Sequence, residues 1–138
     1  MRIGIDLGGT KIEIAALDAA DGAVLAQAQA AGFALHWRHS VTLTPVEARY
    51  ALLPGGAIVQ TEERFAAHGP GMAHDAPGWR REGEMFVLPL ARAVNRLVLR
   101  AAAEHENRLA IAGQTIDLTR WPGVPIDLVP LPCEEIRP

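Results

Sequence analysis

The sequence predicts a small mixed α/β fold of the α+β type, in which a small mixed sheet carries an N-terminal β-hairpin and one principal amphipathic helix. Two periodic patterns support this prediction. Over residues 2–6 and 12–16, apolar residues alternate with smaller or polar ones, which is the period of a strand. Over residues 89–104, apolar residues recur at helical spacing. The helical stripe consists of Leu90, Val94, Leu97, Val98 and Ala101. Two such periods in one chain predict a helix packed against a sheet.

Shorter β-prone runs bounded by turn residues predict the other strands. These runs are residues 23–26, 40–44, 49–53, 57–61 and 109–118. Pro54-Gly55-Gly56 predicts a hairpin between the third and fourth runs, and Gly113-Gln114 predicts a tight turn within the last run. In a competing interpretation, Thr44 caps a short helix that has Pro45 at its first position. The hairpin is the preferred interpretation.

Two segments lack any period. Residues 68–83 contain four glycines and two prolines and are predicted to be a loop. Half of the ten prolines follow Trp121, so residues 121–138 are predicted to form an extended, irregular tail. Residues 28–120 are an unassigned mixed α/β region.

Composition limits the class of protein. The chain has 138 residues, of which 49% are hydrophobic, and this predicts one small domain over residues 1–138. A net charge of −3 favours neither a nucleic-acid partner nor a membrane partner. Cys133 is the only cysteine, so no intramolecular disulfide can form, and the expected location is cytoplasmic. The five histidines are interpreted as solvated or hydrogen-bonded and not as metal ligands, because His36 and His39, three residues apart, would lie on opposite faces of a strand.

The turn between the first two predicted strands has features of a phosphate-binding loop. Gly8 and Gly9 can adopt positive φ and allow an anion to approach the backbone, whose N–H groups can form an anion-binding nest. Thr10 adds a hydroxyl group, and Lys11 is the only lysine in the chain. Asp6 is a hard oxygen ligand that suits Mg²⁺.

With its flanking strands, this turn resembles the first phosphate loop of the ROK family of sugar kinases and repressors, within the actin, hexokinase and heat-shock ATPase superfamily. The resemblance covers residues 1–27. It implies that ATP and Mg²⁺ bind at this loop, with Asp6 as the metal ligand. The residues implied to bind the cofactor are Asp6, Gly8, Gly9, Thr10 and Lys11.

The remainder of the chain departs from the ROK pattern. No Asn-Asp pair supplies a catalytic base, so no catalytic residue is assigned, and the second lobe of such a kinase is missing. The sequence therefore predicts a sugar-kinase-like protein that is incomplete and catalytically inactive alone.

An alternative is a small non-catalytic α+β domain for interaction or assembly, possibly from a fused or frameshifted reading frame. A protein partner would bind either the proline-rich tail or the basic ridge of the predicted helix. This ridge consists of Arg92, Arg96 and Arg100.

Overall fold

The computed structural model shows a chain built of antiparallel β-strands and describes residues 12–18, 24–29, 32–53, 56–66 and 78–132. Within these ranges there are eleven strands and two short 3-10 helices, and there is no α-helix. The strands are β1 (Ile12–Asp18), β2 (Val24–Gln29), β3 (Gly32–Arg38), β4 (Pro45–Leu52), β5 (Ile58–Phe65), β6 (Arg80–Glu82), β7 (Met85–Val94), β8 (Leu97–Arg100), β9 (Arg108–Ile111), β10 (Gln114–Asp117) and β11 (Pro125–Pro132). The 3-10 helices are η1 (Ala103–His105) and η2 (Leu118–Arg120). The predicted α+β fold with a principal helix is therefore wrong.

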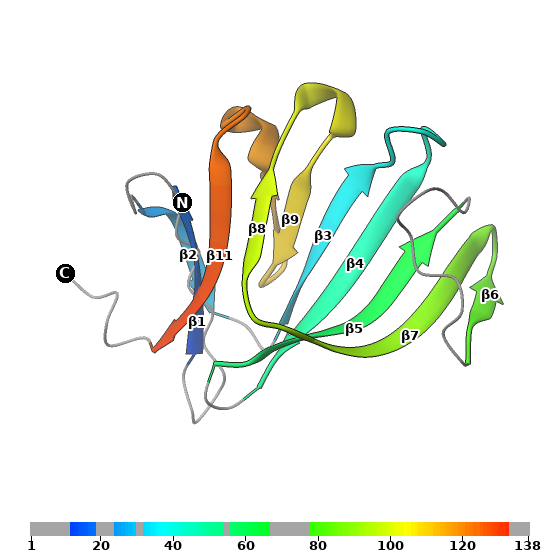
Figure 1. Cartoon of the computed structure of the whole chain (residues 1–138), viewed down its shortest axis with the longest axis horizontal. Coiled ribbons are helices and arrows are strands. Elements are labelled where there is room, and N and C mark those ends of the chain that lie inside the picture. The colour runs from blue at the N-terminus through cyan, green and yellow to red at the C-terminus, as the bar shows by residue number, and fades with distance from the viewer. Residues whose placement is uncertain (1–11, 19–23, 30–31, 54–55, 67–77, 133–138) are drawn as a thin grey trace.

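The smaller sheet has the strand order β2-β1-β11-β8 (Figure 1). Its centre includes β11, although an irregular tail was predicted there. Proline fits in this strand because Pro125 is its first residue, and Pro130 and Pro132 lie beyond Leu128, where the pairing with β8 ends. Where a neighbouring strand lies on only one side, the position of the missing proline N–H can face the open side. No hydrogen bond between strands is then lost.

The larger sheet has the strand order β10-β9-β3-β4-β5-β7-β6, and all of its pairs are antiparallel. Strand β7 belongs to this sheet and β8 to the smaller one, and only residues 95 and 96 separate them. The chain thus passes directly from one sheet to the other at this point, which Figure 1 shows as a long curved ribbon.

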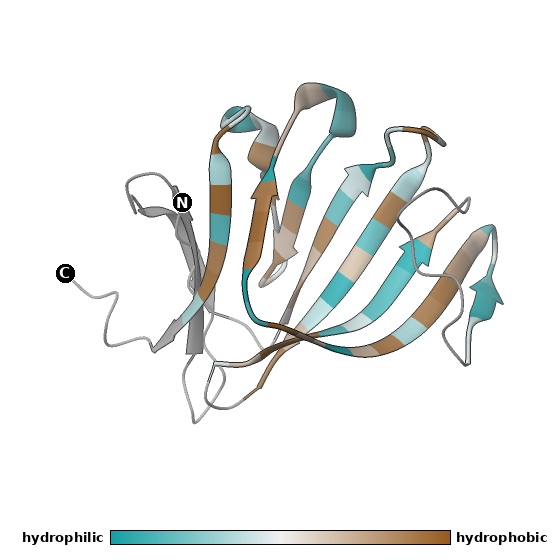
Figure 2. Ribbon diagram, viewed as in Figure 1, coloured by the Kyte–Doolittle hydropathy of each residue, from teal (hydrophilic) through white to brown (hydrophobic). Residues whose placement is uncertain are grey.

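The two sheets share a hydrophobic core. Antiparallel partners point to the same side of a sheet, so register identifies the inner face. Phe33 and Leu35 of β3 lie opposite Ile111 and Leu109 of β9, and all four side chains are buried. From the smaller sheet, β11 contributes Ile126 and Leu128 to the same cluster. A second cluster, at the other end of the larger sheet, contains Val46, Phe65 and Leu88. Apolar and polar bands alternate along these strands in Figure 2.

The helix predicted over residues 89–104 is replaced by the end of β7, a turn and β8. Leu97 and Leu99 pair with Leu128 and Ile126, so they face the core, whereas Val98 between them is 43% exposed. Core-facing and solvent-facing side chains thus alternate along β8, as they do in any strand. Leucine, alanine and arginine are good helix formers, but pairing with β11 overrides that preference.

Two local predictions are confirmed. Leu52 pairs with Ile58 across the turn that contains Gly56, which forms the predicted hairpin. Ile111 pairs with Gln114, so the second hairpin turns at residues 112–113, one residue earlier than predicted. Both turn residues have positive φ, as a type I′ turn requires.

Three other local predictions differ from the structure. Residues 40–44 form a turn and not a strand, while the short helix considered after Thr44 is strand β4. Part of the predicted loop over residues 68–83 is strand β6. Of the predicted N-terminal hairpin, residues 1–11 lie outside the described residues, and β1 pairs with β2 and β11. Within the described residues, no helix is long and apolar enough to cross a membrane. The cytoplasmic location stays a prediction.

The outer face of the larger sheet carries a ladder of ion pairs, which we call the outer ladder. Its centre is Glu62, whose side chain is only 14% exposed and lies within 4 Å of three arginines. Val87 is fully buried on this face because the arginines of β5 and β6 lie opposite it in register. The members of the outer ladder are Glu47 and Arg49 of β4, Glu62 and Arg64 of β5, and Arg80 and Glu82 of β6.

The central position of β11 can be tested with Leu128→Ala. Because Leu128 is 2% exposed, removing its side chain should lower the free energy of unfolding by about 3 kcal/mol. Val98→Ala, on the solvent side of the neighbouring strand, is the control and should cost no more than about 0.5 kcal/mol. Urea unfolding of both variants measures the difference. Equal effects would show that residues 125–132 do not form a central strand.

The outer ladder predicts a pH dependence of stability. Burial raises the pKa of Glu62, but the hydrogen bond from Arg64 and the charges of Arg64 and Arg49 outweigh it, so the pKa lies below the usual 4.5. A depressed carboxyl pKa contributes stability above the pKa of the unfolded state, and this is lost as pH falls through the folded pKa. Glu62→Gln should therefore lower stability at pH 7, by about 1 kcal/mol, and the loss should shrink below about pH 4.5.

Acid and urea unfolding between pH 3 and pH 7 measures this dependence. The exposed Glu84, which lies in the turn between β6 and β7 and is not a member of the outer ladder, provides the matched control Glu84→Gln. A Glu62→Gln deficit that stays constant across this range would contradict an electrostatic role for Glu62.

Candidate functional site

The residues predicted to bind ATP and Mg²⁺ lie outside the described residues. This applies to Asp6, Gly8, Gly9, Thr10 and Lys11. Nucleotide and Mg²⁺ binding at that loop stays a prediction. Among the residues that the structure does describe, no group of three or more His, Cys, Asp or Glu side chains is arranged to hold a metal ion.

The predicted basic ridge does not exist as a helix face. Arg92 lies on β7, Arg96 in the following turn and Arg100 on β8. Arg96 pairs with Asp127 at 3.4 Å, and Arg100 donates a hydrogen bond to the carbonyl of Gly123 at 3.1 Å. Arg96 and Arg100 thus contact their own fold, and binding of a protein partner through the three arginines stays a prediction.

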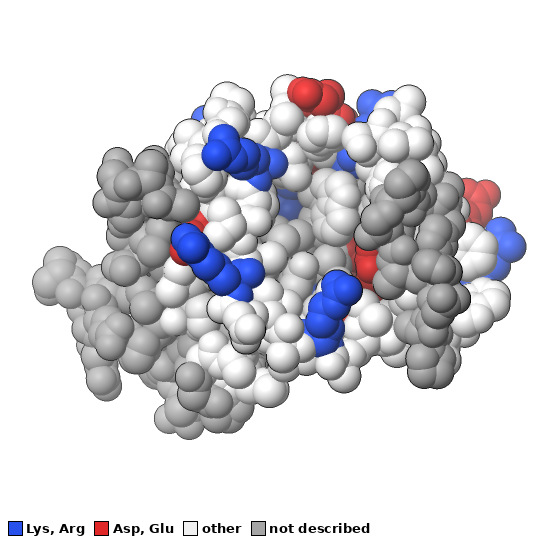
Figure 3. Space-filling model, in the orientation of Figure 1, with Lys and Arg blue, Asp and Glu red and all other residues white. Residues whose placement is uncertain are grey.

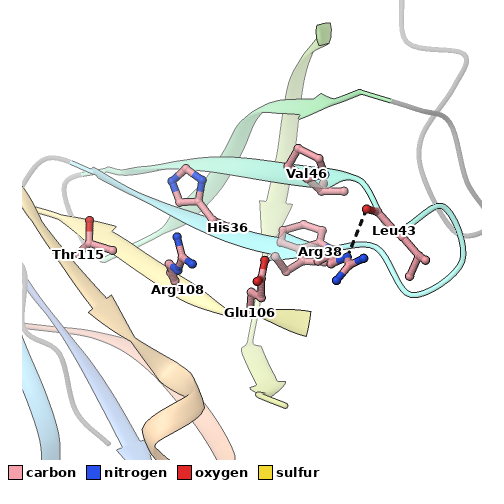
Figure 4. Close-up of a pocket in the computed structure, with 9 residues that line it drawn as sticks. His36, Arg38, Leu43, Val46, Glu106, Arg108 and Thr115 are labelled. Carbon is pink, nitrogen blue, oxygen red and sulfur yellow. Dashed lines mark hydrogen bonds between the residues drawn. The ribbon is translucent and has the colours of Figure 1, made fainter. Parts of the chain in front are cut away.

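The structure brings a different set of residues together on the outer face of β3 and β9. His36 of β3 lies directly opposite Arg108 of β9, and Arg38 follows two residues after His36 on the same face. Thr115 of β10 is on this face too, because it pairs with Ala110, two residues after Arg108. These side chains line a cavity of about 490 Å³, which we call the outer pocket (Figure 4).

The outer pocket has a second wall made of loop residues. Leu43 and Pro45 come from the β3–β4 connection, and Glu106 comes from the turn after η1. In Figure 4 the carboxylate of Glu106 lies between Arg108 and Arg38. Glu106 has a left-handed backbone with φ of 50°, which ends η1 and directs the chain into β9.

The guanidinium groups of the outer pocket retain free hydrogen-bonding capacity. Arg38 donates from Nε to the Leu43 carbonyl at 3.3 Å, which leaves both of its Nη groups for other acceptors. Within the described part of the chain, neither Arg38 nor Arg108 has a carboxylate within 4 Å. Arginine seldom leaves its planar fork unused in a partly enclosed site, and the natural partners of that fork are carboxylates and phosphates.

His36 connects the outer pocket to the outer ladder. Its Nε2 lies 3.3 Å from Oε1 of Glu47, whose other oxygen is 2.9 Å from Nε of Arg49. The His36 side chain is 40% exposed, whereas that of Glu47 is 17% exposed. Glu47 therefore orients one edge of the imidazole, and the remaining ring surface is available to the pocket.

The β3–β4 loop is held by His39, which is buried. Its Nδ1 accepts hydrogen bonds from the backbone N–H groups of Val41 and Thr42, at 3.1 and 3.3 Å. Backbone bonds from His39 to Thr44 and from Leu43 to His39 close the loop, with Leu43 at a φ of 56°. This arrangement fixes the Leu43 carbonyl that positions Arg38. His39 is thus a structural residue of the pocket wall.

Sequence reasoning did not select the residues of the outer pocket. Alternation along residues 32–38 places His36 and Arg38 on one side of a strand, so the signal for that pair was present in the sequence. Strands β3 and β9 bring together residues that are about seventy positions apart in the sequence, such as His36 and Arg108. No local sequence pattern indicates a pairing over such a separation. The association with Arg108 therefore required the structure.

Comparison with known proteins identifies a family but no characterised relative. The family model described as "Domain of unknown function (DUF1850)" matches residues 33–118. No curated protein matches the chain, and no solved structure matches it. The match begins at the second residue of β3 and extends past the end of β10, so it includes every residue of the outer pocket.

This match overturns the ROK resemblance. The matched segment forms antiparallel sheet, with no feature of an actin-like kinase fold, and nothing points to sugar-kinase function or to the α+β interaction domain considered as its alternative. Two glycines between alternating strands suit any tight turn, so residues 1–27 were too short a pattern to identify the kinase family. Since the family model matches more than half of the chain, the protein belongs to the DUF1850 family.

Proposed function

We propose that the protein binds a small oxyanion, either an organic carboxylate or a phosphate, in the outer pocket. The observation that carries this proposal is the convergence of two guanidinium groups, Arg38 and Arg108, neither of which has a carboxylate of the described residues within 4 Å. Their forks provide several N–H donors on one side of the cavity.

Neighbouring groups support the same ligand class. The Thr115 hydroxyl lines the same cavity and can donate to a further oxygen of the ligand. Glu106 limits the excess positive charge, so the pocket favours a small anion over an extended polyanion. The whole chain carries a net charge of −3, so attraction of an anion depends on this local arrangement and not on overall charge.

The exposure of the pocket sets the expected affinity. Arg108 is exposed and Arg38 is half-buried, so water competes for both guanidinium groups. Two or three charge-assisted hydrogen bonds under these conditions correspond to a Kd of about 1 mM. The affinity should fall with added salt, because partly exposed charges are screened.

Titration of the ¹⁵N-labelled protein with inorganic phosphate and, separately, with succinate tests the proposal. The amide signals of residues 36–38, 108 and 115 should move first. Arg38→Gln and Arg108→Gln should each weaken binding about tenfold or more, because each removes a charged donor but retains an amide. The titration that gives the lower Kd shows whether phosphate or a carboxylate is the better ligand.

Arg96→Gln is the matched control, because Arg96 is 68% exposed and pairs with Asp127 away from the outer pocket. It should change affinity less than twofold. Binding that is equally sensitive to Arg96→Gln and Arg108→Gln would reveal only general charge attraction, and that result would refute the proposed site. An absence of shifts with both anions would refute it as well.

A further inference from the structure

The inner face of the larger sheet holds a second cavity, which we call the inner cavity. It has a volume of about 240 Å³ and lies between β8 of the smaller sheet and β3–β4 of the larger one. Its lining is mainly apolar and consists of Leu35, Trp37, Tyr50, Leu99 and Leu118, together with the polar residues His36, Asn107 and Arg108. Figure 3 shows the molecule hollowed on the face toward the viewer, where β8 and β4 lie on either side in Figure 1.

The walls of the inner cavity are firmly held. Leu118 is fully buried, and Leu35 is 8% exposed. The ring of Tyr50 stacks on Phe33, with centroids 4.9 Å apart and planes 13° apart. Trp37, Tyr50 and Leu99 belong to the core cluster but are only partly buried. Aromatic and leucine surfaces that are fixed but incompletely covered form a preformed site for an apolar molecule.

One side of the inner cavity approaches a polar row on the same face. Tyr50, Gln60 and Arg92 lie opposite one another on β4, β5 and β7. Burial raises the pKa of Tyr50, and the nearby charge of Glu63 raises it further, while Arg92 acts in the opposite direction. The phenol therefore stays protonated and lies among groups of both charges. A neutral group with a hydrogen-bonding atom fits this end better than an ion, which would lose its hydration there.

The volume limits the size of a ligand. Drug-sized molecules occupy pockets of about 300–1,000 Å³, whereas an apolar cavity of about 150 Å³ in another protein accommodates benzene. A cavity between these sizes holds one or two fused rings. Flat aromatic walls at Trp37 and Tyr50 favour a ring over a flexible chain, because stacking adds to the burial of apolar area.

We propose that the inner cavity is a second binding site, for a small neutral ring compound that carries one hydrogen-bonding group. The ligand lies between Trp37, Tyr50 and Leu99. Its polar atom faces the phenol end of the cavity.

Indole is a suitable probe, because it is neutral, has two fused rings and carries one N–H. Titration monitored by ¹⁵N chemical shifts should give a Kd of about 0.1–1 mM, with the largest shifts at residues 35, 37, 50, 99 and 118. No shift at these positions, or shifts confined to residues lining only the outer pocket, would overturn the proposal.

Two variants and a control test the location of the ligand. Leu99→Trp fills the cavity and should abolish indole binding, whereas Val98→Trp places the same side chain on the solvent side of β8 and should leave the affinity within twofold. Tyr50→Phe keeps the stacking on Phe33 and should weaken indole binding about threefold to tenfold. If Leu99→Trp does not fold, the indole affinity of Tyr50→Phe and the chemical shifts of the wild-type protein test the location of the ligand. Wild-type affinity in Tyr50→Phe together with unmoved cavity amides would overturn the proposal.

Discussion

The packing of β11 against the larger sheet is the constraint on which the rest of the structure depends. Ile126 is fully buried and Leu128 nearly so, and both belong to the cluster that contains Phe33, Leu109 and Ile111 of the other sheet. A two-sheet protein of this size has no α-helix within its described residues to cover an apolar face, so each sheet must be covered by the other. The smaller sheet is arranged around the strand that supplies this contact, with β1 on one side and β8 on the other.

Once the inner face is assigned, the outer face follows from the alternation of side chains. Residues one position away from the core residues of β3, β4 and β9 must point outward, and these include His36, Glu47 and Arg108. The same strands therefore carry mainly apolar side chains on the inner face of the sheet and charged side chains on the outer face. Trp37 and His36, neighbours in sequence, illustrate this division, because their side chains leave β3 on opposite sides.

Sequence patterns predicted features that depend on neighbouring residues, such as hairpin turns, but not the pairing of strands that are far apart in the sequence. Both confirmed hairpins are closed by turns in which glycine adopts positive φ, at Gly56 and Gly113, and turn chemistry of this kind is readable within a few residues. The prediction of a helix over residues 89–104 was wrong because the segment fits two patterns. Leu90, Val94 and Leu97 recur at helical spacing, but Leu97, Leu99 and Ala101 recur at every second residue, as in a strand. Only the partner strand decides between these two patterns, and β11 begins at residue 125.

The predicted kinase family was wrong for a related reason. Two glycines in a turn are compatible with phosphate binding and also with an ordinary hairpin, and the family match favours neither a kinase fold nor its chemistry. In contrast, opposite charges two residues apart on a strand, as in Glu47-Ala48-Arg49 and Glu62-Glu63-Arg64, were a readable sign of a solvent-facing ladder. Arg108 could not be associated with His36 before the register of β3 and β9 was known.

The distribution of charge explains why an anion site arises on a chain that is acidic overall. On β4, β5 and β6, each carboxylate of the outer ladder lies within 4 Å of at least one arginine, so little unbalanced charge remains there. Arg38 and Arg108 lie at the other end of the same face, beyond the reach of those carboxylates. The outer ladder takes up acidic groups that would otherwise oppose an incoming anion, and Glu47 extends it only as far as His36. Pairing within the outer ladder thus leaves the guanidinium groups of Arg38 and Arg108 without a carboxylate within 4 Å among the described residues, although the net charge of the chain is −3.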